Sequence, residues 1–138
     1  MSANKTTLSS LDISRLETLL YREENRGACP AHPVALLEEK LCLADERSPR
    51  DMPAHVVTMN SKVVLVDLKR NETIERTLAF PRAGGLAASE VSVLTPVGAQ
   101  LLGAAPGYLI GDATSGRGSR FRVQEIVYQP ESSGRYDL

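Results

Sequence analysis

The sequence predicts an α+β fold: a short antiparallel helical hairpin followed by a small, mostly antiparallel sheet domain with one short helix. Apolar residues repeat at helical spacing twice within the first fifty residues. From His55 onward, strand-like patterns replace them. A length of 138 residues suits one compact domain with a small appendage. We therefore predict a helical domain at residues 1–50 and a sheet domain at residues 51–138.

The first predicted helix spans residues 11–24. Its start can be capped by Ser9 together with Asp12, or by Asp12 alone. Gly27 and Pro30 end it, because neither residue continues a helix well. The apolar face consists of Ile13, Leu16, Leu19 and Leu20.

A second helical pattern follows Pro33, a residue that suits the first turn of a helix. Its apolar stripe consists of Val34, Leu37, Leu41 and Ala44, and Pro49 and Pro53 end the pattern. Two amphipathic helices joined by about eight residues fold back most simply as an antiparallel hairpin. We expect each apolar stripe to cover the other.

The remainder of the chain shows the patterns of strands. Residues 63–68 and 73–80 flank a polar turn and predict a β-hairpin. Further strands are expected at residues 91–94, 108–110 and 121–128. The tail from Gln129 to Leu138 is polar, and we expect it to be extended.

A helical turn is predicted between these strands. Thr95 suits its N-cap, Pro96 its first position, and Gly103 its end. Val97 and two following leucines can be buried. This strand-to-helix corner is either a core connector or a contact point for a partner.

Composition excludes several classes of function. Sixteen Lys and Arg face seventeen Asp and Glu, so the net charge is −1, which is a poor basis for binding DNA or RNA. Two Phe, four Tyr and no Trp argue against base-stacking platforms. The sequence lacks a signal-peptide pattern and an apolar run of roughly 20 residues, so we expect a cytoplasmic protein without a membrane segment.

No constellation of residues predicts a metal centre or a catalytic site. Cys29, His32, Cys42 and His55 lack the spacing of a zinc site, and Cys42 is expected to be half-buried in its helix. Glu23 and Glu24 could hold Mg²⁺, but paired acids are also what a solvated helix end usually carries. We therefore predict no cofactor and no metal.

Three blocks of sequence carry a resemblance to a known family. Residues 57–63, 92–103 and 127–131 closely resemble the regulator of nucleoside diphosphate kinase (Rnk) family, which is related to the Gre transcript-cleavage factors. The resemblance implies an FKBP-like fold for residues 51–138 and a short coiled coil before it. It also implies docking on bacterial RNA polymerase at the rim of the secondary channel. The contacting residues would be Leu94, Thr95, Pro96 and Val97.

The hairpin departs from the Gre pattern. A Gre factor delivers two tip carboxylates to the catalytic Mg²⁺ of the polymerase, through a much longer coil. At 1.5 Å per residue the hairpin predicted here is only about 20 Å long, so Glu23 and Glu24 should fall short. The tip around Cys29 has no acid. We expect a non-catalytic regulator that competes with Gre-type factors and affects nucleoside diphosphate kinase levels.

Two alternative functions remain. An FKBP-like fold raises the possibility of a peptidyl-prolyl isomerase, although such sites are lined with several aromatics, which are scarce here. The same corner could also serve a protein-binding module for a partner other than polymerase. The sequence does not indicate the oligomeric state.

Overall fold

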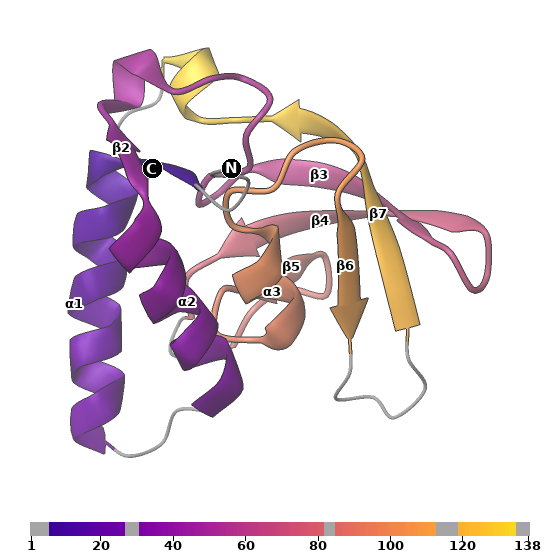
Figure 1. Ribbon diagram of the computed structural model, residues 1–138. Coiled ribbons are helices and arrows are strands. Elements are labelled where there is room, and N and C mark those ends of the chain that lie inside the picture. Colours follow the sequence, from indigo (N-terminus) through magenta and orange to yellow (C-terminus); the bar gives the residue numbers. More distant parts are fainter. Residues whose placement is uncertain (1–5, 27–30, 82–84, 113–118, 135–138) are drawn as a thin grey trace.

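The computed structural model describes residues 6–26, 31–81, 85–112 and 119–134, with side chains described outside residues 22–33 and 112–119 (Figure 1). The helices are α1 (Ser10–Arg26), α2 (Ala31–Leu43) and α3 (Pro96–Leu101), with 3₁₀ turns η1 (Pro49–Asp51) and η3 (Glu131–Ser133). The strands are β1 (Thr7–Ser9), β2 (Asp45–Arg47), β3 (Lys62–Asp67), β4 (Glu72–Ala79), β5 (Glu90–Ser92), β6 (Leu109–Asp112) and β7 (Ser119–Tyr128). This composition confirms the predicted α+β class.

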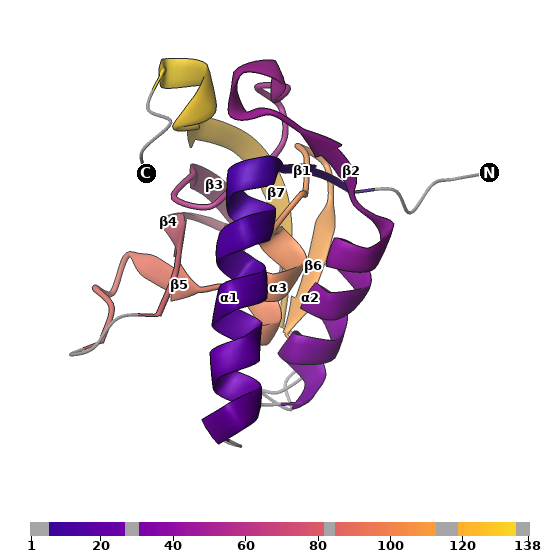
Figure 2. The same cartoon turned by 90° about the vertical axis from the view of Figure 1, so that its left-hand side faces the viewer.

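Both predicted helices are present, and each is slightly longer than its pattern indicated. α1 begins directly after Ser9, whose Oγ accepts the Asp12 amide hydrogen at 3.0 Å, so the predicted cap is confirmed. α2 begins two residues before Pro33. The two helices lie side by side and run in opposite directions (Figures 1 and 2).

The main sheet has five strands in the order β5-β4-β3-β7-β6. The predicted β-hairpin is confirmed as β3 and β4, which pair from Lys62↔Thr77 to Asp67↔Glu72. β7 pairs antiparallel with both β3 and β6. β5 instead pairs parallel with β4, so the sheet is mixed where an antiparallel one was predicted.

β7 breaks the simple alternation that the sequence suggested for it. Its register against β3 shifts twice, between Val64 and Leu65 and between Lys62 and Val63. Each shift moves the following side chain to the other face of the sheet. As a result Ile126 packs against the core, while Val127 is 50% exposed.

One core joins the helices to the sheet. Leu16 and Leu20 of α1 and Leu37 of α2 belong to the same buried cluster as Val63, Leu65 and other sheet residues. The apolar stripes therefore pack into the core that the helices share with the sheet domain, where the sequence predicted that they would cover each other. In Figure 2 both helices lie in front of α3 and the sheet. The predicted division at residue 50 stays a prediction.

Two connections were absent from the sequence prediction. β1 and β2 form a small parallel sheet that joins the start of α1 to the end of α2. The tail does not extend as predicted: Gln129 and Glu131 are buried, and η3 follows the last strand. Within the described ranges, no helix is long and apolar enough to cross a membrane.

Candidate functional site

The corner between β5 and α3 is built as its sequence predicts. Thr95 is the N-cap of α3, and its Oγ1 accepts the Gly98 amide hydrogen at 3.1 Å. The same hydroxyl donates to the Ser92 carbonyl oxygen at 2.7 Å. Pro96 occupies the first helical turn, where its missing amide hydrogen costs nothing. The corner is thus held rigidly by local hydrogen bonds.

The four predicted contact residues lie together at this corner. Leu94, Thr95, Pro96 and Val97 are all half-buried, less accessible than a freely exposed corner would be. Leu94 and Val97 pack against the core with part of their surface. Three of the four corner residues, Leu94, Pro96 and Val97, are apolar, and their backbone is held by hydrogen bonds. An apolar surface on a rigid backbone suits contact with another protein.

The opposite end of α3 is held by a lysine from the helical hairpin. The Lys40 Nζ donates to the carbonyl oxygens of Ala99 and Leu102 at 2.6 Å each, and of Gln100 at 3.1 Å. Burial lowers the pKa of the Lys40 ammonium from 10.5 to about 8, so it remains mostly charged at neutral pH. The positive charge complements the negative end of the helix dipole.

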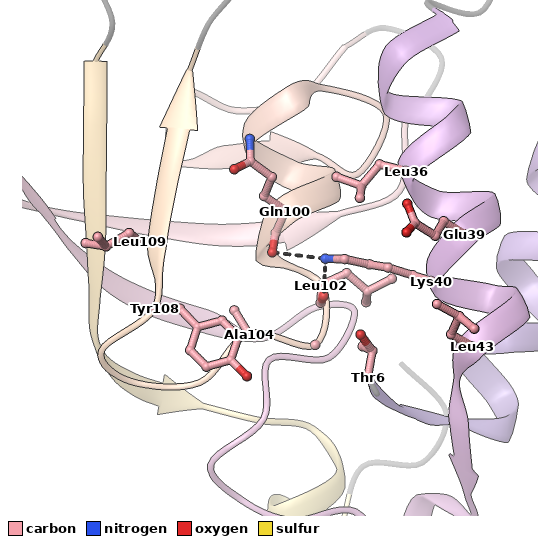
Figure 3. A pocket seen from close by; sticks show the side chains of 11 residues that line it. Thr6, Leu36, Glu39, Lys40, Leu43, Gln100, Leu102, Ala104, Tyr108 and Leu109 are labelled. Carbon is pink, nitrogen blue, oxygen red and sulfur yellow. Dashed lines mark hydrogen bonds between the residues drawn. The ribbon is translucent and has the colours of Figure 1, made fainter. Parts of the chain in front are cut away.

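Lys40 lies in a pocket of about 310 Å³ between α2, α3 and β6 (Figure 3). Leu43, Tyr108 and Leu109 line it and are 46%, 53% and 62% exposed. The side-chain amide of Gln100, also in the lining, hydrogen-bonds both the amide and the carbonyl group of Gly111 on β6. The ammonium group of Lys40 and the side-chain amide of Gln100 are therefore bound to the protein itself.

Replacing Lys40 by methionine is expected to lower the free energy of unfolding by about 2 kcal/mol, because three carbonyl groups lose their donor. Thermal melting with two-state analysis measures the change. Glu39→Gln, an exposed neighbour in the same pocket, is the matched control and should be nearly neutral. Equal melting of Lys40→Met and wild type would contradict the capping role.

A second polar cluster lies where α1 meets the sheet domain. We call Ser9, Asp12, Thr58, Met59, Ser61 and Glu131 the α1 joint. Its residues other than Met59 are polar and buried, and its hydrogen bonds connect segments 47 and 73 residues apart. Asn60, within the same turn, has φ 68°, a left-handed conformation that asparagine tolerates better than most residues. The turn thus explains why Thr-Met-Asn-Ser stands there.

Gln129 holds the adjacent loop in place. Its Nε2 donates to the carbonyl oxygens of Pro53 and Val56 at 2.7 Å each, and its Oε1 accepts the Ser132 amide hydrogen at 3.2 Å. Sequence reasoning missed Gln129 and Glu131 because polar residues near a chain end resemble a solvated tail. The only signal for them was the resemblance of the Tyr-Gln-Pro-Glu block.

The predicted hairpin tip is described only in part. The backbone of Glu23 and Glu24 is part of α1, but their side chains are not among those that the structure describes. Cys29 lies outside them altogether. Cys42 is exposed, which corrects the prediction of half-burial, since it lies on the α2 face away from the core. No cluster of three His, Cys, Asp or Glu that could hold a metal occurs in the described part of the chain.

Two aromatic residues of the sheet domain, Phe80 and Tyr108, lie in different pockets. Phe80 lines a pocket beside α1, where the Arg15 guanidinium lies 5.8 Å from its ring centroid. Tyr108 lines the pocket around Lys40 instead. These two rings therefore do not enclose a common site for proline.

Comparison with known proteins places these features in a family. Residues 52–128 match the family described as transcription elongation factor, GreA/GreB, C-terminal. The regulator of nucleoside diphosphate kinase from Escherichia coli K12 is 36% identical over 140 residues, covering all of both chains, as is its Shigella flexneri counterpart. A solved GreA/GreB elongation factor from Nitrosomonas europaea is 35% identical, with a TM-score of 0.73 over 90% of this chain and 98% of that one.

Proposed function

Because the chain belongs to the regulator of nucleoside diphosphate kinase family and carries a GreA/GreB C-terminal domain, we propose that it is a non-catalytic transcription regulator that binds RNA polymerase. It acts in the bacterial cytoplasm near the secondary channel of the polymerase, competes with Gre-type elongation factors, and thereby affects nucleoside diphosphate kinase levels. An FKBP-like sheet domain and a coiled-coil hairpin are parts of the same proposal. The observation that carries it is the full-length similarity to a named regulator together with the Gre-type domain.

The corner of β5 and α3 supports a role in protein binding. Its backbone is held by the Thr95 hydroxyl, and Pro96 restricts it further. A rigid contact surface loses little conformational entropy on binding. Leu94 and Val97 supply its apolar surface. We assign polymerase contact to Leu94, Thr95, Pro96 and Val97.

The length of the helices supports competition without catalysis. α1 has 17 residues and α2 has 13, so at 1.5 Å per residue they are about 25 and 20 Å long. Hairpin helices of this length place Glu23 and Glu24 well short of a catalytic centre that only a longer coil reaches. The protein would then occupy the docking surface without stimulating RNA cleavage.

The proposal is tested with purified core RNA polymerase and a labelled Gre factor. We expect the unlabelled protein to displace the Gre factor in a concentration-dependent way. We also expect no acceleration of transcript cleavage in backtracked complexes. Failure to displace the factor at saturating concentration would overturn the docking proposal, and accelerated cleavage would overturn its non-catalytic part.

Substitutions at the corner test its assigned residues. Pro96→Ala and Val97→Asp are expected to weaken polymerase binding at least about tenfold, through lost preorganisation and a charge placed in an apolar contact. Val127→Asp, at a 50% exposed position on β7, is the matched control. Since Val97 is half-buried, each variant is first shown to melt cooperatively. Unchanged affinity of both corner variants would move the contact elsewhere.

A further inference from the structure

The α1 joint brings two carboxyl groups onto neighbouring residues. The Asp12 Oδ2 accepts the Met59 amide hydrogen at 3.0 Å. The Glu131 Oε1 accepts the Thr58 hydroxyl hydrogen at 2.6 Å. Asp12 is 1% exposed and Glu131 is 8% exposed. Two acids from distant parts of the chain are therefore buried near enough for their charges to interact, at the point where α1 meets the sheet domain.

The second oxygen of Asp12 is left without a partner. Its Oδ1 is fully buried and accepts no hydrogen bond from any described residue. An ionised carboxylate with a free buried oxygen is costly, because water solvates both oxygens in the unfolded chain. Asparagine at this position would accept the same Met59 amide hydrogen without burying a charge. The acid is therefore not needed for the hydrogen bond alone.

Burial, together with a neighbouring acid, favours the protonated form of Asp12. Burial raises the pKa of Asp12 from 3.8 to about 6, and the neighbouring charge of Glu131 adds to this increase. The Met59 amide hydrogen, the Arg15 guanidinium and the Ser9 hydroxyl act in the opposite direction without cancelling it. These groups come from α1, β1, the turn before β3 and η3.

We propose that the α1 joint is a proton-binding site, through which mild acidification makes the contact of α1 with the sheet domain firmer. In the ionised state, two negative charges repel one another across the joint. In the protonated state, Asp12 keeps its Met59 hydrogen bond and the repulsion disappears. This property goes beyond polymerase binding and does not depend on it.

The direction of the pH effect follows from the two pKa values of Asp12. Because the folded value of about 6 exceeds the ordinary value of 3.8, the folded state binds the proton more tightly than the unfolded state. Above the folded pKa, ionised Asp12 lowers the free energy of unfolding by its full amount. This destabilisation decreases as the pH falls from the folded pKa toward the ordinary value of 3.8. Between about pH 7.5 and pH 5 this linkage favours folding by about tenfold.

Asp12→Asn tests the proposal, because asparagine keeps the hydrogen-bond acceptor and cannot ionise. We expect the folding equilibrium constant of wild type, divided by that of Asp12→Asn, to rise about tenfold between about pH 7.5 and pH 5. Denaturant titrations at the two pH values measure this ratio. A ratio that is the same at both pH values would overturn the proposal.

Two measurements on proteins that retain Asp12 test whether the pH dependence of stability arises at the α1 joint. In the wild-type protein, the side-chain carboxyl resonance of Asp12 should titrate near pH 6, and the Glu131→Gln variant should lower that midpoint. The Met59 amide donates to Asp12, so its exchange reports opening of the joint, and its protection factor should increase on acidification because the folded state gains stability. A midpoint near the ordinary value of 3.8, with Met59 protection independent of pH, would overturn the proposal even if Asp12→Asn did not fold.

Discussion

Replacing Gly98 by alanine is expected to destabilise the protein by more than about 3 kcal/mol, or to prevent folding altogether. A Cβ atom at Gly98 would overlap the backbone carbonyl oxygen of Ser92, and its nearest further neighbours are also backbone atoms. Backbone cannot turn aside as a flexible side chain can. The substitution would therefore push α3 away from the strand that leads into the predicted contact corner.

Gly111→Ala is the matched control for this experiment. Gly111 lies on β6, and a Cβ built there meets nothing within 4 Å. We expect this variant to melt close to wild type, because the position has space and no left-handed backbone. Urea or thermal unfolding of both variants measures the difference. If Gly98→Ala were as stable as Gly111→Ala, the close approach of α3 to Ser92 would be wrong.

Leu37→Ala is expected to lower the free energy of unfolding by about 3 kcal/mol, within the range found for fully buried leucines. Leu37 is 0% exposed and belongs to the core cluster that α2 shares with α1 and the sheet domain. Removing its side chain leaves a cavity in that shared core. The loss should therefore affect the whole cooperative transition rather than the helices alone.

Leu43→Ala controls for the loss of a leucine from the same helix. Leu43 is 46% exposed at the end of α2, so its truncation should cost less than about 1 kcal/mol. Leu41 is half-buried on the predicted stripe, so Leu41→Ala should lower the free energy of unfolding by an intermediate amount. Hydrogen exchange of the sheet amides in Leu37→Ala tests the shared core. Accelerated exchange confined to α1 and α2 would show that the helices unfold independently of the sheet.

Much of the fold follows from signals within about ten residues. The cap at Ser9, the stripe around Leu37 and the hairpin of β3 and β4 were predicted, since each depends on neighbours in sequence. The parallel pairing of β5 was missed because a three-residue strand carries no directional signal. The register shifts of β7 were missed because they depend on which residues of β3 it meets.

The sequence likewise predicted the local features of the candidate site but not its long-range contacts. The cap of α3 by Thr95 and the position of Pro96 follow from local chemistry and are confirmed. The half-burial of the corner and the role of Lys40 at the other end of α3 could not be predicted. Lys40 binds carbonyl groups about sixty residues further along the chain, and no local pattern connects them.

The sequence by itself determined the α+β class, the two amphipathic helices, the corner at Thr95 and Pro96, and, through its resemblance, the family. Tertiary structure alone decided that both helices share one core with the sheet and that Gln129 and Glu131 are buried. It also decided that Asp12 and Glu131 meet on Thr58 and Met59. Capping and periodicity act between near neighbours, whereas burial of a polar group depends on which distant segment supplies its partner.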